Sequence, residues 1–266
     1  MASNKDSFGR TLFVVVGLCL VCSIFVSTAA VLLKPTQQEN KLLDKQKFIL
    51  EAANLIDSKS KVSKDEVLKT YKKYVEAKVI ELKSGDEVTS INGDSINGDT
   101  YDQKKASRDP ATSVVPEHDI ASVKRIAKNA VVYLVRDDAG KVTSVILPVH
   151  GYGLWSTMYA FLALEPDMNT IQNLVYYNQA ETPGLGGEVE NPSWKAKWQG
   201  KKLFDEQGNI AITVTKNPAV AETDHGVDAL SGATLTSNGV QHSLTFWLGE
   251  EGFARFIEKA RNGGLS

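Results

Sequence analysis

The feature that most limits how this chain can fold is a long apolar run without a single charge. It extends over residues 11–33 and reads TLFVVVGLCLVCSIFVSTAAVLL. An α-helix needs about 20 apolar residues to cross hydrocarbon, so this run is long enough for one spanning helix. A cleavable signal peptide is the alternative because small residues occur at 27–30, but signal apolar regions usually have only about 7–15 residues. We therefore predict a lipid-embedded anchor at 11–33, preceded by an N-terminal tail at 1–10.

The orientation of this anchor is less strongly specified than its span. Lys5 and Arg10 precede the run, and the segment after it carries more basic residues: Lys34, Lys41, Lys45 and Lys47. A positive-inside count therefore favours a cytoplasmic C-terminal part, although long domains translocate largely regardless of flanking charge.

Composition restricts the partners and the chemistry of the rest of the chain. The 266 residues have a formal net charge of -2, whereas a nucleic-acid binder normally has a strongly basic face, so we expect no nucleic-acid partner. The only cysteines, Cys19 and Cys22, lie in the apolar run. Their spacing puts them on one helix face, which suits either a redox pair or two small packing residues. The remainder has no disulfide framework.

Residues 34–110 are predicted to form a helical leader and a polar loop. Apolar spacing indicates a helix over 37–57, and Ser63 followed by Glu66 is typical of the capping box that starts a helix. A short strand is expected at 78–82. The segment 84–110 contains two Asn-Gly dipeptides, which favour a solvated loop or small hairpin, and its carboxylates do not have the spacing of a calcium loop.

Residues 111–266 have the pattern of an α+β domain with a mainly antiparallel sheet and flanking helices. The β-branched runs Val131–Arg136 and Val142–Leu147 are joined by a turn-forming sequence, which predicts a hairpin. Further strands are expected at 159–164, 170–177 and 210–215, and helices from about Thr236 and over 251–261.

The segment Asp228–Asn238 carries the strongest indication of chemistry. It is a hydroxyl-rich turn with a glycine that runs into the predicted helix. A helix N-terminus offers free N–H donors and the positive end of the dipole, which suit a phosphate. The alternative is an ordinary N-cap, in which a Ser or Thr hydroxyl accepts those hydrogen bonds.

The string Asp-x-x-Ser-Gly-Ala-Thr at 228–234 resembles the flavinylation signature of an FMN-binding domain family. That family includes the C subunit of bacterial sodium-translocating NADH:quinone oxidoreductases and the G subunit of the related Rnf complexes. The resemblance implies that Thr234 carries FMN covalently through a phosphoester, and that Asp228 and Ser231 complete the motif read by a flavin transferase that uses FAD. The adjacent candidate cofactor residues are Gly232, Ala233, Leu235 and Thr236.

Two further glycine-rich blocks, at 148–155 and 181–187, are similar to blocks of the same family. Glycines permit close backbone approach, and backbone amides together with Thr182 would hydrogen-bond the flavin edge. Trp155 or Leu185 would cover its face. We include Glu181, Thr182, Leu185 and Trp155 among the candidate flavin contacts, with a turn and a core tryptophan as the alternative.

The resemblance implies a polypeptide that relays electrons and is not a complete enzyme alone. Its complex would oxidise NADH, reduce ubiquinone and move sodium outward, with those sites on other subunits. The soluble domain would be periplasmic and the tail at 1–10 cytoplasmic, at a bacterial inner membrane, against the lysine count. Two alternatives remain: the G subunit of an Rnf-type ferredoxin:NAD complex, and a membrane-tethered binding module without redox function.

Other enzyme classes lack their sequence signatures. The chain has no Gly-x-x-x-x-Gly-Lys-Ser/Thr phosphate loop, and Gly184-Leu185-Gly186-Gly187 lacks the spacing of a dinucleotide fingerprint. No Gly-x-Ser-x-Gly elbow surrounds Ser231, and the histidines are scattered without metal-ligand spacing. We therefore predict neither a metal site nor a catalytic residue in this chain.

Overall fold

The structure is a computed structural model that describes residues 8–57, 61–91 and 93–265. The chain divides into a first unit that ends at Lys45 and a second unit that covers 46–266. Most of the predicted tail at 1–10 lies outside the described residues, because the description begins at Phe8. The domain boundaries drawn at 33 and 110 stay predictions.

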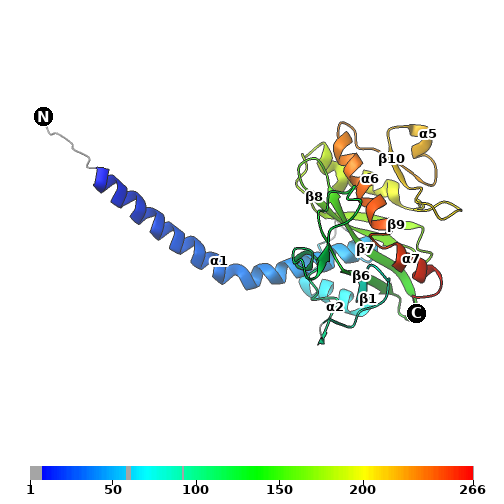
Figure 1. Ribbon diagram of the computed structural model, residues 1–266, viewed down its shortest axis with the longest axis horizontal. Helices are drawn as coiled ribbons and strands as arrows, with labels where there is room; N and C mark the ends of the chain where they lie inside the picture. The colour runs from blue at the N-terminus through cyan, green and yellow to red at the C-terminus, as the bar shows by residue number, and fades with distance from the viewer. Residues whose placement is uncertain (1–7, 58–60, 92, 266) are drawn as a thin grey trace. The chain divides into compact units, whose positions relative to one another are not determined.

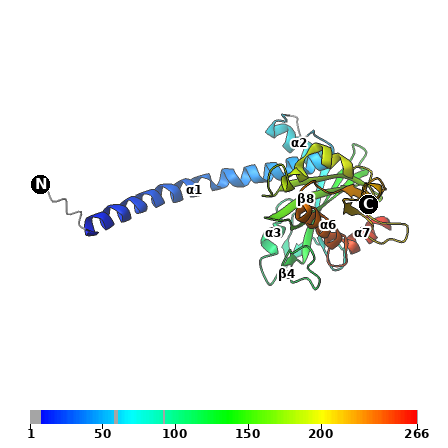
Figure 2. The same cartoon turned by 90° about the horizontal axis from the view of Figure 1, so that it is seen from above.

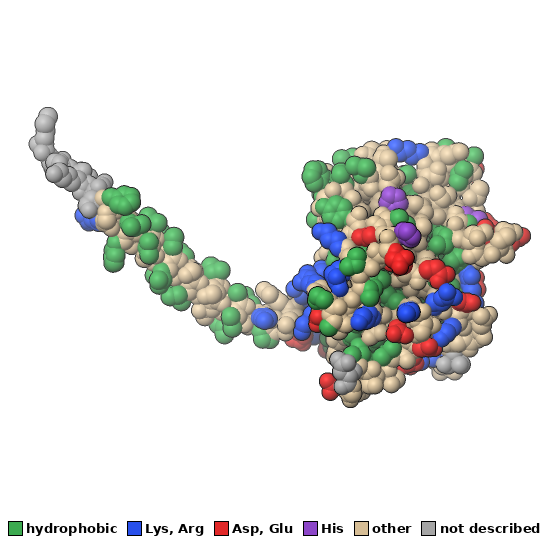
Figure 3. Space-filling view, viewed as in Figure 1, with side chains coloured by type: hydrophobic (Ala, Val, Ile, Leu, Met, Phe, Trp, Pro, Cys, Tyr) green, Lys and Arg blue, Asp and Glu red, His purple; other side chains and the backbone are tan. Residues whose placement is uncertain are grey.

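Helix α1 (Phe8–Ala52) contains the apolar run. It is long and apolar enough to cross a membrane, and the side chains of its apolar window are exposed, as the hydrophobic surface along this helix in Figure 3 illustrates. The separate helix predicted at 37–57 is the continuation of α1, because Pro35 removes one backbone donor without ending the helix. The helix ends because Asn54 adopts a left-handed conformation with φ 56°, while the Leu55 N–H donates to the Leu50 carbonyl.

The second unit is built on a five-stranded antiparallel sheet in the order β1-β6-β7-β8-β9. Its strands are β1 (Val75–Glu81), β6 (Asn129–Arg136), β7 (Val142–Tyr152), β8 (Thr157–Leu164) and β9 (Ile171–Asn178). The predicted α+β class with a mainly antiparallel sheet is therefore confirmed. The predicted hairpin is β6–β7, and β7 continues to Tyr152, so the first glycine-rich block begins inside a strand.

Both faces of this sheet are covered, as Figures 1 and 2 show from two directions. On one face, α6 (Thr234–Leu248) and α7 (Ala254–Arg261) join the main apolar core. On the other face, Phe48 of α1 packs on Tyr177 of β9, with ring centroids 6.1 Å apart. Alternating side chains of each strand thus enter two buried layers, which is why the strand sequences are almost continuously apolar.

Smaller elements surround the sheet. The predicted Ser63 cap is confirmed, since its hydroxyl accepts from the Glu66 N–H and α2 (Lys64–Tyr74) follows. Gly93 of the first Asn-Gly lies between β2 and β3 with φ 90°, and Asn92 lies outside the described residues. Gly98 packs against the Ala77 backbone instead of turning a second hairpin. The remaining short elements are β2 (Ser90–Ile91), β3 (Asp94–Ser95), α3 (Gln103–Ala106), β4 (Ser113–Val114), β5 (Ile126–Ala127), η1 (Gly186–Glu190), α4 (Pro192–Lys195) and η2 (Ala196–Trp198).

A pair of short parallel strands lies outside the main sheet. β10 (Thr213–Thr215) pairs with β11 (Gly226–Asp228), and the short helix α5 (Pro218–Ala221) connects them. The predicted strand at 210–215 is therefore shorter than expected, and residue 210 forms only an isolated bridge with Phe204. Because the strands are parallel, the residues that follow both of them emerge at the same end.

The close approach of α6 to β7 depends on Gly239. A Cβ at this position would lie 2.4 Å from the Tyr152 carbonyl oxygen, and a backbone atom cannot swing aside. Alanine is the better helix former by about 1 kcal/mol. We nevertheless expect Gly239→Ala to lower the free energy of unfolding of the full chain by at least about 1 kcal/mol, because overpacking costs more. Urea denaturation measures this, with exposed Asn238→Ala as the neutral control. A stabilised Gly239→Ala variant would contradict the packing described.

Candidate functional site

The turn at 228–233 delivers the chain into α6 without a side-chain cap. Ala233 occupies the N-cap position and makes no side-chain hydrogen bond, and Gly232 supplies the left-handed conformation with φ 70°. Among the described residues, the backbone N–H groups of Thr234, Leu235 and Thr236 have no protein acceptor. The ordinary N-cap interpretation is therefore wrong, and the end of the helix remains open to an anion.

The hydroxyl groups around this helix end have different partners. Thr236 and Ser237 are buried: the Thr236 hydroxyl donates to the Glu181 carboxylate at 2.7 Å, and the Ser237 hydroxyl donates to the Ala233 carbonyl at 3.0 Å. Thr234 is exposed, and its Oγ1 accepts a hydrogen bond from Lys216 Nζ at 2.6 Å. Ser231 is also exposed, in the turn. Thr234 therefore combines an accessible hydroxyl with the open end of the helix.

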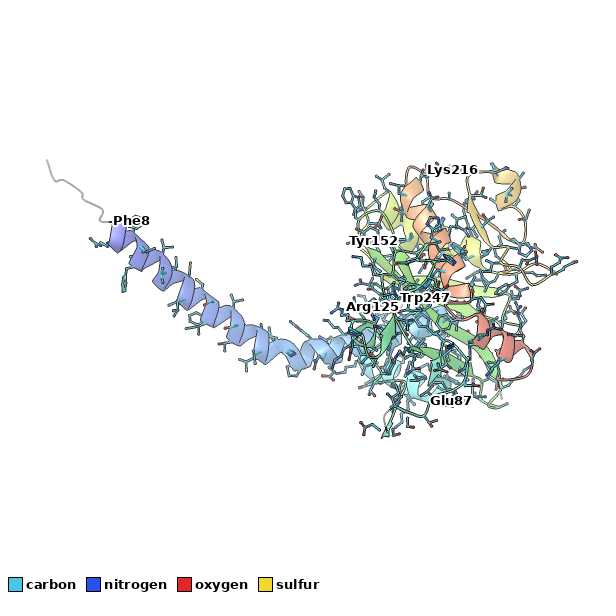
Figure 4. The ribbon with its side chains drawn as sticks, viewed as in Figure 1. Phe8, Glu87, Arg125, Tyr152, Lys216 and Trp247 are labelled. Atoms are coloured by element: carbon cyan, nitrogen blue, oxygen red, sulfur yellow. The ribbon has the colours of Figure 1, made fainter. Side chains whose placement is uncertain are left out.

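Lys216 reaches this position because of the parallel strand pair. It follows β10 directly, and the 228–234 turn follows β11, so both leave the same end of the pair. Figure 4 shows Lys216 beside one end of α6, with Trp247 toward the other end. Lys216 was not among the predicted site residues, because nothing in its immediate neighbours distinguishes it from other surface lysines. The parallel pairing of β10 and β11 is the only signal that would have found it.

Asp228, the first residue of the signature, forms an ion pair with Lys197. Its backbone carbonyl accepts a hydrogen bond from the Trp194 indole N–H at 2.8 Å. The carboxylate remains half exposed, so the aspartate is both fixed in place and accessible from solvent. Lys197 and Trp194 belong to the segment after the glycine-rich block at 181–187, and no sequence pattern connects this segment with the signature.

Glu181 joins the three glycine-rich segments. Glu181 is 5% exposed. Its carboxylate accepts hydrogen bonds from backbone N–H groups of the 153–156 loop and from the Thr236 hydroxyl of α6. The donors in that loop are Leu154 N at 3.1 Å, Trp155 N at 3.0 Å, Ser156 N at 3.1 Å and Ser156 Oγ at 3.3 Å. The side chain predicted to contact a flavin therefore holds the surrounding loops together.

Burial alone would raise the pKa of Glu181. The hydrogen bonds from Trp155, Thr236, Leu154 and Ser156 outweigh this effect and leave the pKa of Glu181 below its ordinary value. The carboxylate is thus held in its charged form, which makes it the stronger acceptor for all of these donors.

Glycines at 153 and 186 allow the segments to reach this carboxylate. A Cβ on Gly153 would lie 2.7 Å from Glu181 Oε1, and one on Gly186 would lie 2.5 Å from Thr236 Oγ1. The two outer blocks therefore need glycine for close approach to one another and to α6, as well as for any approach to a ligand.

Apolar side chains lie exposed around the helix end. Trp155 is 66% exposed, and Leu185 and Leu235 are also exposed. A Cβ on Gly232 would lie 3.1 Å from Leu185 Cδ2, which places Leu185 directly against the turn at 228–233. The core interpretation of Trp155 is therefore wrong. Together with exposed Thr182, these residues leave both apolar and polar side chains accessible near the start of α6.

The described residues contain no group of three or more His, Cys, Asp or Glu side chains that could hold a metal ion. His150 is enclosed between the rings of Tyr159 and Trp247, with centroids at 5.2 and 4.8 Å. Burial, together with the positive charge of Lys104, lowers the pKa of His150 to about 4. This histidine is therefore neutral near pH 7 and belongs to the core beside α6.

Comparison with known proteins first identifies the class of protein. Residues 153–249, which include the 153–156 loop, Glu181 and the start of α6, match the family described as FMN-binding domain. The chain is 53% identical to the C subunit of Na(+)-translocating NADH-quinone reductase from Vibrio anguillarum, over 100% of both chains. It is 49% identical to the same protein from Yersinia pestis, over 98% of this chain and 96% of that one.

Solved structures agree with this assignment. The crystal structure of Shewanella oneidensis NqrC has a TM-score of 0.75 and 38% identity, covering 84% of this chain and 99% of that chain. The C subunit of the reductase from Parabacteroides distasonis has a TM-score of 0.64 and 28% identity, covering 85% and 96%. The chain belongs to the family of C subunits of Na(+)-translocating NADH-quinone reductases. It is a flavoprotein component of an oxidoreductase complex, with an FMN-binding domain and one apolar N-terminal helix.

Replacing the central carboxylate tests its structural role. We expect Glu181→Gln to lower the free energy of unfolding at pH 7 by about 1.5–3 kcal/mol, because hydrogen bonds to a charged acceptor are lost. The folded-state pKa is lowered, so the stabilisation by Glu181 is complete above the unfolded value of 4.5 and is lost as the pH falls through the folded value. The midpoint temperature of thermal unfolding should therefore fall less steeply between pH 7 and pH 3 in Glu181→Gln than in the wild type.

Glu206, whose side chain is exposed, provides the matched control. Glu206→Gln should follow the wild-type curve at every pH. Equal stability of Glu181→Gln and wild type at pH 7 would show that the carboxylate does not hold the loops.

Proposed function

We propose that FMN is esterified through its phosphate to Oγ1 of Thr234. The observation that carries this proposal is the exposed Thr234 hydroxyl at an uncapped helix N-terminus, 2.6 Å from the Lys216 ammonium group. Helix N–H groups and a lysine are the groups that stabilise a phosphate. The protein residues fit the cofactor because one hydroxyl, an anion-binding helix end and an apolar surface lie together.

The remaining candidate residues would position the cofactor around this bond. Ser231, Gly232 and Ala233 form the turn whose backbone surrounds the phosphate. Leu235, Leu185 and Trp155 would contact the flavin ring, and the backbone near Thr182 would hydrogen-bond its edge. Glu181 and Thr236 act indirectly, since each hydrogen-bonds the other and fixes the loop that carries Trp155.

Bound FMN accepts and donates single electrons, which suits a carrier between other redox centres. We infer that the chain serves this role in a complex that oxidises NADH, reduces ubiquinone and pumps Na⁺ outward, in contact with the other subunits. The relatives named as C subunits support this assignment over the G subunit of an Rnf-type complex. The FMN-binding domain match argues against a membrane-tethered module without redox function.

The maturation partner would be a flavin transferase that uses FAD as the FMN donor. Asp228 and Ser231 would form part of the surface it reads, and both are accessible from solvent. We further infer that α1 anchors the chain in the bacterial inner membrane with residues 46–266 in the periplasm. This orientation is the one that the family resemblance implies, and it is opposite to the one that the flanking lysine count favours.

Removal of the acceptor hydroxyl should abolish attachment while leaving the fold intact. The full chain carrying Thr234→Ala or Thr234→Val, coexpressed with the transferase, should show no ultraviolet fluorescence in the denatured gel band, because only covalent flavin survives denaturation. Thr223→Ala, at another exposed threonine, is the matched control, and its peptide containing Thr234 should still carry the flavin. Fluorescence retained by Thr234→Ala would contradict the assignment, as would a yellow wild-type product from cells without a transferase.

Orientation is measurable with reporter fusions at the C-terminus. Alkaline phosphatase folds only in an oxidising compartment, so a fusion after Ser266 should be active, and a fluorescent protein that folds only in the cytoplasm should remain dark. The reverse pair of results would show that the lysines at 34–47 determine the orientation.

A further inference from the structure

Lys216 is a surface lysine that contacts the hydroxyl of Thr234. Among the described residues no carboxylate forms an ion pair with it, and its ammonium group donates to the neutral hydroxyl of Thr234. Nearby Lys197, in contrast, pairs with Asp228. Lys216 also lies at the N-terminal end of α6, where the helix dipole is positive, so both would stabilise a negative charge placed between them.

We propose that Lys216 is a catalytic residue for flavin attachment and afterwards the counter-ion of the attached phosphate. This inference rests on the proposed function of Thr234. In the attachment step, Thr234 Oγ1 forms a bond to the FMN phosphorus of FAD, the pyrophosphate P–O bond to the AMP half breaks, and AMP leaves. The hydroxyl proton passes to a base supplied by the transferase. The ammonium group of Lys216 stabilises the negative charge that builds on Oγ1 as this proton departs.

The hydrogen bond also determines which lone pair of Oγ1 is free to attack phosphorus. Lys216 donates to one lone pair of Oγ1, which leaves the second lone pair for phosphorus and the hydroxyl proton for the base. The product is a phosphodiester with one negative charge in place of a neutral hydroxyl. That charge then lies between Lys216 and the free N–H groups of α6, and both stabilise it.

Topology makes this contact a built feature. The backbone of β10 is fixed by β11 over Thr213–Thr215, and the Val214 N–H donates to the Gln241 side chain of α6 at 2.7 Å. The Gln241 amide in turn donates to the Ile212 carbonyl at 3.1 Å. The strand that precedes Lys216 is therefore attached to the same helix that presents Thr234, so the lysine and the hydroxyl are held in register.

The test measures modification kinetics of the full chain in detergent, with purified transferase and FAD, through the rate at which gel fluorescence appears. Lys216→Gln should lower kcat for modification roughly tenfold to hundredfold, the effect of removing a charged hydrogen-bond donor, and leave KM for the chain unchanged. Lys216→Arg keeps the charge and should retain more of kcat than Lys216→Gln. Lys202→Gln, at an exposed lysine away from Thr234, should behave as wild type. Melting temperatures should be equal in all four chains.

The outcomes separate this inference from the proposed function. A wild-type chain that acquires no flavin on Thr234 would overturn both. If wild type is modified on Thr234 and Lys216→Gln has the same kcat, only the role of Lys216 is overturned. A raised KM with unchanged kcat would also overturn it, since Lys216 would then bind the transferase surface. A lower melting temperature for Lys216→Gln with unchanged kcat would give the lysine a purely structural role.

Discussion

The site depends on a single buried carboxylate with five donors. Glu181 accepts from three backbone N–H groups and one hydroxyl of the 154–156 loop, and from Thr236 in the first turn of α6. Burying a carboxylate costs free energy unless it is fully hydrogen-bonded, so the donors of the neighbouring segments must lie beside Glu181. The glycines at 153 and 186 follow from it, because a side chain at either position would overlap the carboxylate or its partner. Thr234 and Trp155 are positioned as a consequence.

Electrostatics then distinguish the outer surface of the site from its interior. Negative charge is buried at Glu181 and neutralised by donors, whereas positive potential is left at the surface by Lys216 and by the open end of α6. The division between buried Thr236 and exposed Thr234, two residues apart on one helix, decides which hydroxyl holds the fold together and which is accessible from solvent. The same helix therefore contributes both stability and the proposed acceptor hydroxyl, and a ligand phosphate would complete its N-terminal hydrogen bonds.

Much of the fold and part of the site were predictable from sequence, and the errors have physical causes. The β6–β7 hairpin, the Ser63 cap and the start of α6 near Thr236 followed from local patterns that need no tertiary information. The break expected between the anchor and a second helix was wrong, because Pro35 is tolerated within α1. Lys216 and Lys197 were missed because their positions arise from the pairing of distant strands and loops. Glu181 stays a predicted site residue, and its hydrogen bonds to two other segments could be seen only in three dimensions.

The chemistry proposed for this site requires that one exposed threonine at the end of a helix bears a phosphate-linked flavin. Tandem mass spectrometry of the Thr234 peptide, taken from the mature protein isolated from its native membrane, is the decisive measurement. We expect a peptide whose mass is increased by FMN less one water, with the fragment ions placing the addition on Thr234. An unmodified peptide, or fragment ions that place the flavin on Ser231 or Thr236, would show that Thr234 is not the acceptor.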